Sequence, residues 1–402
     1  MTRPALAAAL LATAAFSGAP LSAETHRVDP GEGASERLQE ALILAAPGDV
    51  IELGAGRFVL NDGLSLDVDG VTVRGAGMQQ TILDFTGQQG AGEGLLVTSD
   101  EVTLRDFAVE NAKGDAIKSK GADNIVYYRL QVTWTGGPKA SNGAYGLYPV
   151  ESTGVLIDGC VVSGASDAGI YVGQSKDITV RYSVAEYNVA GIEIENSRNA
   201  IVHNNLATRN TGGILVFDLP SLPVMNGGNV TIAGNVVVDN DTPNFAPPGN
   251  IVAGVRRGTG IMVMANENVV IEENWIDRNP TTAVMVISYP NAFDDARYDP
   301  APRDVRINRN RFGRNGYDPQ IDGAPMLLAA FGGSLPPVLW DGLGEAPEAG
   351  SPDNQAAWTL GLPHQAAGFD KARPQTVTLK SSINVGGVVR YGAPAALEAR
   401  LR

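Results

Sequence analysis

Short hydrophobic runs, each preceded by a glycine or alanine, recur down the middle of this chain. The small residues that open the runs are Gly94, Ala116, Gly146, Gly169, Gly191, Gly213, Gly260 and Ala283. Their successive separations are 22, 30, 23, 22, 22, 47 and 23 residues. A period of about 20 to 25 residues is typical of one supersecondary unit stacked many times. The pattern therefore predicts a solenoid.

Each repeat contains two further short apolar runs that are rich in β-branched residues. Val155-Leu156-Ile157 is an example of the second run and Val161-Val162 of the third, with Gly, Asn and Asp residues between runs. Three short strands in one repeat leave no room for a helix, and the spacing of a leucine-rich repeat is absent. We therefore predict an all-β, single-stranded parallel β-helix with three sheets and about ten coils.

The ends of the repeat region predict caps, because an open solenoid end would expose both the core and strand edges. After a short N-terminal strand, Ser35 is expected to cap a helix over 36–46 that stops at Pro47-Gly48. We assign residues 24–47 to this strand and capping helix, 48–315 to the β-helix and 316–402 to an irregular C-terminal cap. Within that cap, 326–328 is expected to add a partial coil and 375–379 a last strand.

The first 23 residues have the pattern of a secretory signal peptide. Arg3 precedes an apolar stretch from about Ala5 to Phe16, and Ala23 offers a small residue for cleavage. No later stretch is long and apolar enough for a membrane span. We therefore expect an exported protein, periplasmic or extracellular.

Charge and cysteine content narrow the possible partners. Without the signal peptide, 29 Lys and Arg stand against 44 Asp and Glu, so the net charge is 29 − 44 = −15. This balance disfavours nucleic acid as a general partner, since binding needs a basic surface. The single Cys160 lies in an apolar run and is expected to be a core residue.

A resemblance to a known superfamily rests on two motifs. Residues 45–58 read A-x-P-G-D-x-I-x-L-x-x-G-x-F, and the coils read G-I-x-[VI] and x-[VI]-x-[VI]-x-x-N. This combination resembles the right-handed parallel β-helix superfamily, which includes pectate lyases, alginate-lyase-like enzymes and mannuronan epimerases. Within it, the chain is similar to uncharacterised bacterial exported β-helix repeat proteins, often encoded beside a cytochrome-like protein. The resemblance implies right-handed coils and suggests such a partner. The D-P-H-D sequence of the epimerases is absent.

A column of asparagines falls at the turn after the second strand. Its members are Asn205, Asn235, Asn274 and Asn310. Asparagine tolerates left-handed backbone at a tight turn, and its amide can bond to the copies above and below. We predict a structural ladder of stacked amides.

The candidate site lies on the outer face of the first strand of each coil. Side chains alternate along a strand, so inward Ile192 and Ile194 place Glu193 and Glu195 outward. The same alternation gives one outward column that contains Lys118, Tyr148, Tyr171 and Glu193, and a second that contains Lys120 and Glu195. Insertions at 133–145, 218–228, 239–259 and 288–303 flank this sheet, and insertions in a solenoid gather on the binding face. We therefore predict a walled groove.

These side chains suit carbohydrate chemistry. In β-elimination from a uronate, a cation such as Lys118 or Lys120 neutralises the carboxylate, and a lysine or tyrosine such as Tyr148 or Tyr171 takes the neighbouring proton. Glu193 and Glu195 could instead form the acid and base of a glycoside hydrolase. Tyrosine stacking and Lys–Glu pairing would equally stabilise a bare sheet, so a purely structural role stays open.

Two other surfaces need an interpretation. The continuation of the outward columns is apolar, and we expect the walls to cover it; its members are Leu215, Phe217, Met262, Met264 and Met285. On the second sheet, Asp158, Arg181 and His203 could form an acid, a cation and a base, but no long insertion flanks them.

These observations predict an exported protein that binds an extended, anionic polysaccharide, and they leave open whether it also cleaves that polysaccharide by β-elimination. The alternative is a noncatalytic scaffold that docks an exported protein partner on the same face. We expect a monomer. Asp294-Asp295 and Glu193/Glu195 are the close acidic pairs near the groove, but no calcium-binding motif is present, so the cofactor stays undetermined.

Overall fold

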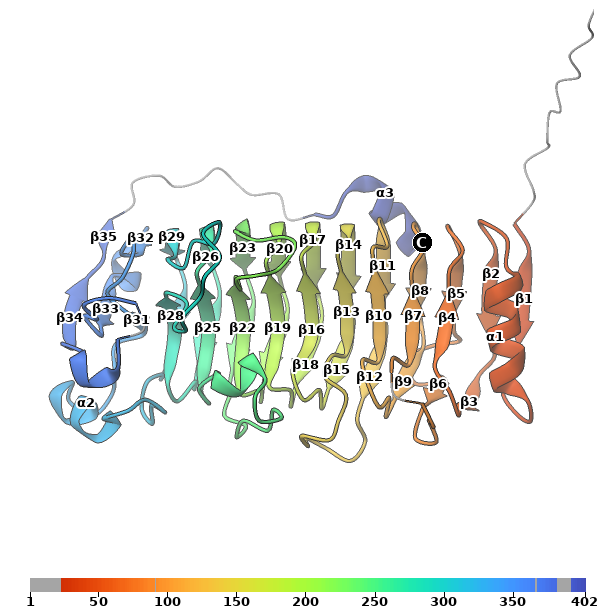
Figure 1. Ribbon diagram of the computed structural model, residues 1–402, viewed down its shortest axis with the longest axis horizontal. Coiled ribbons are helices and arrows are strands. Elements are labelled where there is room, and N and C mark those ends of the chain that lie inside the picture. Colours follow the sequence, from red (N-terminus) through yellow and green to blue (C-terminus); the bar gives the residue numbers. More distant parts are fainter. Residues whose placement is uncertain (1–22, 91, 366, 382–391) are drawn as a thin grey trace, which may run out of the picture.

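The computed structural model shows a straight stack of coils with a helix at its N-terminal end (Figure 1). It describes residues 23–90, 92–365, 367–381 and 392–402. The expected signal peptide lies outside the described residues apart from Ala23. Most coils add one strand to each of three long sheets, so the predicted three-sheet parallel β-helix is confirmed.

The three sheets are named here A, B and C. Sheet A has thirteen strands: β1 (Thr25–Val28), β2 (Val50–Leu53), β5 (Thr72–Arg74), β8 (Thr103–Arg105), β11 (Ile125–Tyr128), β14 (Thr153–Asp158), β17 (Lys176–Arg181), β20 (Arg198–His203), β23 (Gly228–Ala233), β26 (Glu267–Glu272), β29 (Arg303–Asn308), β32 (Glu348–Ala349) and β35 (Lys380–Ser381). Sheet B has ten: β3 (Gly56–Val59), β6 (Thr81–Asp84), β9 (Ala108–Glu110), β12 (Gln131–Thr133), β15 (Val161–Ser163), β18 (Val184–Glu186), β21 (Leu206–Thr208), β24 (Val236–Val238), β27 (Trp275–Asp277) and β30 (Arg311–Phe312). Sheet C has twelve: β4 (Leu64–Leu66), β7 (Leu95–Val97), β10 (Ile117–Lys120), β13 (Leu147–Val150), β16 (Ala168–Gly173), β19 (Ala190–Glu195), β22 (Gly212–Phe217), β25 (Thr259–Met264), β28 (Thr282–Ile287), β31 (Val338–Trp340), β33 (Ala356–Thr359) and β34 (Gln375–Thr378).

The small residue that opens each strand of sheet C is required by the coil above it. A Cβ atom on Gly191 would lie 2.5 Å from the carbonyl oxygen of Gly213, and one on Gly213 would lie 2.5 Å from that of Gly260. Alanine stands at the equivalent positions Ala116 and Ala283, so some coils have room for a methyl group. The sequence repeat is therefore a packing requirement between neighbouring backbones.

Two asparagine ladders run through the stack. In the predicted ladder, the side-chain amide of each asparagine donates to the next, at 3.0 Å from Asn205 to Asn235 and 2.9 Å from Asn274 to Asn310. This prediction is confirmed, and Asn354 extends the ladder. A second ladder, which was not predicted, consists of Asn188, Asn210, Asn240, Asn279 and Asn315.

The N-terminal helix caps the first coil as expected, but its start differs. Helix α1 spans Ala34–Leu44 and buries Leu38 and Leu42 against the core. Ser35 is not its N-cap: Gly33 holds that position in a left-handed conformation. A glycine there makes the turn without the strain that a side chain would bring, and the helix begins one residue before Ser35.

The C-terminal region differs more from the prediction. Residues 326–328 lie in helix α2 (Ala324–Ala330) and add no coil, so that expectation is wrong. The coils instead continue beyond 315 through β31, β32, β33 and β35, and the expected strand at 375–379 is β34, which pairs antiparallel with β33. The described residues also form the short helical elements η1 (Ile251–Gly254), η2 (Pro352–Asn354), η3 (Phe369–Lys371), α3 (Ala395–Glu398) and η4 (Ala399–Leu401), and η4 directly continues α3.

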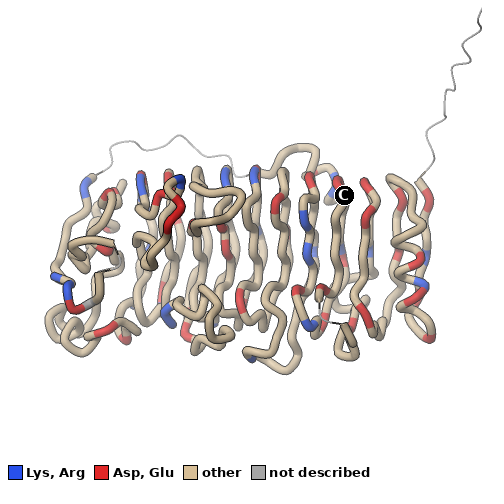
Figure 2. Tube along the Cα trace, in the orientation of Figure 1, with Lys and Arg blue, Asp and Glu red and all other residues tan. Residues whose placement is uncertain are grey.

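The core and the surface follow the sequence pattern. Cys160 is fully buried, as expected, and burial raises the pKa of its thiol to about 12. Acidic and basic positions are interspersed along the solenoid in the view of Figure 2. Among the described residues, no helix has the length and hydrophobicity needed to cross a bilayer.

Candidate functional site

The strand register places the predicted columns on the outer face of sheet C. Lys118 is paired with Tyr148, and Tyr171 with Glu193. In the second column, Lys120 is paired with Val150, which continues through Gly173 to Glu195. The structure therefore brings all six predicted residues onto strands β10 to β19 as one strip, with Lys118 and Lys120 both on β10.

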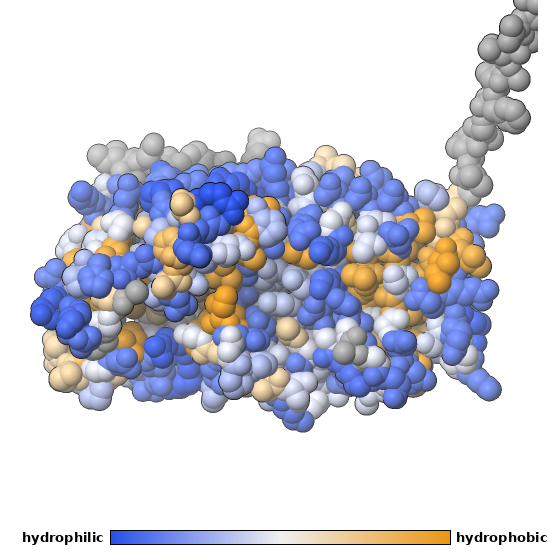
Figure 3. Space-filling view, in the orientation of Figure 1, coloured by the Kyte–Doolittle hydropathy of each residue, from blue (hydrophilic) through white to orange (hydrophobic). Residues whose placement is uncertain are grey.

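Loops wall both long edges of the strip's sheet, as the insertions predicted. The loops after β22 and β28 are bound together, since the Tyr298 hydroxyl donates to the Asp218 carbonyl at 2.7 Å. Asn226 donates its amide to the Arg297 carbonyl at 2.8 Å. On the opposite edge, the loop before β25 is held by Asn244, whose amide donates to the Val252 carbonyl at 2.8 Å. Figure 3 shows this face with the loops on it.

These loops cover most of the C-terminal half of the sheet. Leu215 is fully buried and Phe217 is 3% exposed. They pack in one cluster with wall residues that include Leu219, Tyr289 and Tyr298. The expectation that the walls cover the apolar columns is confirmed. The Met/Phe/Leu patch that a docked protein partner would use is therefore largely inside the molecule.

Three tyrosines form a ring cluster at the open half. The ring centroids of Tyr145 and Tyr148 are 4.4 Å apart, and Tyr171 lies 4.7 Å from Tyr145 and 4.8 Å from Tyr148. Tyr145 comes from the insertion before β13, whereas the other two stand on the sheet. Tyr145 and Tyr148 are half-buried, and Tyr171 is buried. Two aromatic rings thus remain accessible at this point of the groove.

Lys118 stands beside the tyrosine cluster as a paired cation. Its Nζ lies 4.8 Å from the centre of the Tyr148 ring, 3.0 Å from Glu93 Oε1 and 3.4 Å from Asp115 Oδ2. Burial acts to lower the pKa of Lys118, but the hydrogen bond to Glu93 and the charge of Asp115 raise it overall. Lys120 is exposed, and its Nζ is 3.8 Å from Glu151. The amine of Lys118 is thus fixed in the charged form.

Carboxyl groups with raised pKa values lie behind the tyrosines. Burial raises the pKa of Asp167 to about 7 against a hydrogen bond from Tyr145, and the pKa of Glu195 to about 7 against one from Tyr171. Glu193 is 1% exposed, and burial, with the charges of Asp167 and Glu195, raises its pKa well above the usual range. Its Oε1 accepts no hydrogen bond from the described part of the chain. Glu193 is therefore an interior carboxyl group rather than a surface one, and its burial favours the protonated form.

Asp167, Asp115 and Glu93 were not predicted as site residues. All three precede a strand of sheet C and sit in the turn that leads into it. Their signal was an acidic residue before the small residue of the repeat, as in Asp115-Ala116 and Glu93-Gly94. The proximity of these turns to the outward columns was the missing information.

These carboxyls predict that stability falls as pH rises through neutrality. A carboxyl with a raised pKa binds its proton more tightly when folded, so its contribution is lost between the unfolded value near 4 and the folded value. Asp167, Glu195 and Asp218 have folded pKa values of about 7. We expect the melting temperature to drop between about pH 5 and 7.5. Burial lowers the pKa of His203 to about 4. At acidic pH this histidine therefore has the opposite effect, so that its contribution to stability rises as the pH rises.

Comparison with Glu195→Gln isolates one of these groups, because the amide cannot ionise and keeps the shape. We expect the melting temperature of the variant to be close to that of the wild type at pH 5 and to be higher, relative to the wild type, at pH 8. A stability difference between the two proteins that does not change with pH would show that Glu195 titrates normally.

The competing strip on sheet A is occupied by the C-terminal segment. Arg181 bridges Asp158, at 2.7 Å, and Glu398, at 2.5 and 2.8 Å. Leu397 packs on Val126 and Leu156, and α3 lies over these strands in Figure 1. The proposed acid and cation, Asp158 and Arg181, are therefore engaged in holding the C-terminal segment, and His203 lies buried on the strand next to Arg181.

The acidic pairs considered for calcium do not form a cluster. Asp295 binds Arg297 at 2.6 Å, and Glu193 is buried. Within the described ranges, no group of three or more His, Cys, Asp or Glu residues could hold a metal ion.

Comparison with known proteins agrees with this fold. The model of the family "Right handed beta helix region" matches residues 69–224. The A-module of mannuronan C-5 epimerase AlgE6 from Azotobacter vinelandii is 18% identical, with a TM-score of 0.58 over 83% of this chain and 95% of that one. The AlgE4 A-module from the same organism is 14% identical, with a TM-score of 0.52 over 80% and 91%. The Agl-KA catalytic domain is 14% identical, with a TM-score of 0.53 over 83% and 64%.

None of the curated proteins compared with this chain has a significantly similar sequence. The resemblance to the right-handed parallel β-helix superfamily is confirmed by the family match and by the shared architecture. At these identities, the solved structures support the fold alone.

Proposed function

We propose that this protein binds an extended polysaccharide along strands β10 to β19 of sheet C and cleaves it at a uronate unit by β-elimination. The observation that carries the proposal is the contact of Lys118 with the Tyr145–Tyr148–Tyr171 cluster, backed by carboxyls that titrate near neutrality. Two structures with the same fold are mannuronan C-5 epimerases, which supports a carbohydrate ligand of this class.

Binding would use the half-buried rings of Tyr145 and Tyr148. A tyrosine ring offers an apolar face to a sugar and a hydroxyl at its edge, and it loses little conformational freedom on contact. The sheet places one rung about every 4.8 Å along the solenoid, so an extended chain would meet several rungs in succession. The loops that close the C-terminal half limit this track to the open strands.

Each group of the site has one role in the proposed cleavage. Lys118 and the protonated carboxyls reduce the negative charge of the uronate carboxylate, which makes its C5 proton more acidic. Glu195, with a pKa of about 7, is partly ionised at neutral pH and takes that proton. The electron pair forms the C4–C5 double bond as the C4–O4 bond breaks. Burial raises the pKa of Tyr148, so its hydroxyl stays protonated and can give its proton to the leaving oxygen.

The charge of the site constrains the substrate. Glu93 and Asp115 already balance Lys118, so the strip offers no surplus of positive charge. The affinity for a polyuronate therefore depends mainly on protonation of Asp167 and Glu195. We expect tighter binding below pH 7 than above it. The alternative function, docking of a protein partner, required the Met/Phe/Leu patch of sheet C to be exposed, and that patch is largely buried.

The test is incubation of the purified mature protein with a panel of polyuronates and neutral glycans. Unsaturated products are followed by the ultraviolet absorbance of the new double bond, and binding is followed by calorimetry at pH 6 and pH 8. We expect elimination on at least one polyuronate and none on neutral glycans. No unsaturated product and no binding of any glycan would contradict the proposal. Export and association with a cytochrome-like protein stay predictions.

A further inference from the structure

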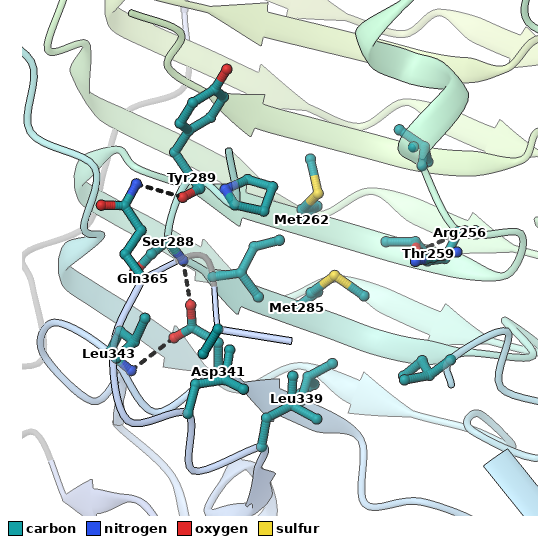
Figure 4. A pocket seen from close by; sticks show the side chains of 18 of the residues that line it. Arg256, Thr259, Met262, Met285, Ser288, Tyr289, Leu339, Asp341, Leu343 and Gln365 are labelled. Atoms are coloured by element: carbon teal, nitrogen blue, oxygen red, sulfur yellow. Dashed lines mark hydrogen bonds between the residues drawn. The ribbon is translucent and has the colours of Figure 1, made fainter. Parts of the chain in front are cut away.

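A cavity of about 340 Å³ lies over the C-terminal coils, apart from the tyrosine cluster. Its floor consists of the outward side chains of three successive strands, Met262, Met285 and Leu339. These rungs extend about 10 Å along the solenoid. Figure 4 shows Arg256 and Thr259 on one side of the floor and Ser288, Tyr289 and Gln365 on the other.

The interior of the cavity is hydrocarbon. Beyond the floor, the apolar lining residues are Val255, Ile287, Pro290, Ile321, Leu343, Leu360, Leu362 and Ala367. Two methionines in the floor give a surface that adapts to the shape of a flexible apolar group. A volume of this size lies within the usual range of small-molecule sites.

Two polar side chains of the lining, Asp341 and Gln365, hold the loops, whereas Ser288 Oγ is buried and has no hydrogen-bond partner in the described part of the chain. Asp341 accepts the backbone N–H groups of Ser288, at 2.6 Å, and Leu343, at 2.9 Å. The Gln365 amide donates to the Tyr289 carbonyl at 2.8 Å. A ligand inside the cavity is therefore offered few polar contacts, so an uncharged carbon chain suits it better than a sugar does.

One cation at the rim is available. Arg256 is exposed and forms no salt bridge with any described residue, whereas its neighbour Arg257 binds Asp318 at 2.6 Å. A guanidinium is well suited to pair with a carboxylate, because its donors form a planar fork. The lining thus combines an apolar floor with the guanidinium of Arg256 at one edge, and the exposed carboxylate of Asp322 also borders the cavity.

We propose that this cavity binds an anionic amphiphile with a single acyl chain, with the chain on Met262, Met285 and Leu339 and the carboxylate at Arg256. The buried Leu215 separates this site from the tyrosine cluster, so the two can be occupied independently. The proposal does not depend on the polysaccharide function.

The test uses decanoate and decanol with the full-length mature protein, measured by calorimetry below their aggregation limits. We expect decanoate to bind and Met285→Trp to abolish binding by filling the floor. Met326→Trp, on α2 outside this cavity, is the matched control and should bind like wild type. Arg256→Gln should weaken decanoate by about fivefold and leave decanol unchanged, in line with a rim ion pair. Arg311→Gln, which is exposed on β30, controls for loss of charge.

Three results would overturn the proposal. Absence of decanoate binding to the wild-type protein would remove the site. Equal binding by Met285→Trp, with its fold verified by circular dichroism, would place the ligand elsewhere. If Arg256→Gln weakened the binding of decanoate and decanol equally, the site would have no preference for an anion. Loss of polysaccharide cleavage alone would concern the tyrosine cluster and leave this site untouched.

Discussion

Gly213→Val is expected to destabilise the protein by about 3 kcal/mol or more, which is at the severe end for overpacking. A Cβ at this position would lie 2.5 Å from the Gly260 carbonyl oxygen, 2.6 Å from a methyl of Val237 and 2.9 Å from the Asn240 amide. The first of these atoms is backbone of the next coil and cannot move without displacing β25. The two further methyl groups of valine worsen the contact.

Urea unfolding followed by circular dichroism measures this effect. Gly254→Val is the matched control, because nothing lies within 4 Å of its Cβ position and no unusual backbone angle is needed. Gly213→Ala should fall between the two, since Ala283 occupies the equivalent site two coils on. A valine variant as stable as the control would show that the coils can separate at no cost.

Tyr148→Phe is expected to reduce elimination by about 10²- to 10⁴-fold, the usual contribution of one proton-transfer group. Phenylalanine retains the ring that packs on Tyr145 and Tyr171 and that faces Lys118. Substrate binding should therefore change little, and the loss should appear in kcat. Tyr148→Ala removes the ring as well and should weaken binding too.

The matched control is Tyr182→Phe, which removes a hydroxyl from an exposed tyrosine that directly follows strand β17 of sheet A. It should leave both kcat and KM unchanged. If Tyr148→Phe retains full kcat, the hydroxyl is not the proton donor and the ring serves only to bind. A change confined to KM would lead to the same conclusion.

Much of this fold could be predicted because a β-helix is built from local, repeated constraints. The alternation that puts Ile192 inward and Glu193 outward depends only on neighbouring residues, so the register of sheet C was predicted correctly. The second asparagine ladder was also within reach: Asn210, Asn240, Asn279 and Asn315 each follow a member of the first ladder by five residues.

Burial of the site could not be predicted in the same way. A side chain that points outward from a strand is exposed only if no other segment covers that strand. Here the covering segments are insertions that do not follow the repeat. Glu193 is outward by register yet 1% exposed, so its chemistry differs from that of a surface carboxylate. The partnership of Tyr145 with Asp167 joins a wall loop to a strand turn, and no periodicity reports it.

The docked C-terminal segment changes how the chain can complete its structure. Coils of a solenoid contact only their neighbours, so they can form one after another as the chain becomes available. The segment breaks this order, because Arg400 donates to the Glu101 carbonyl across 299 positions in sequence. Among the hydrogen bonds of the described residues, that bond closes the longest loop, at an entropic cost that grows only slowly with loop length. The N-terminal coils thus reach their final structure only after the C-terminal residues have docked on them. Proteolytic removal of those residues would therefore change the structure of coils near the other end of the protein.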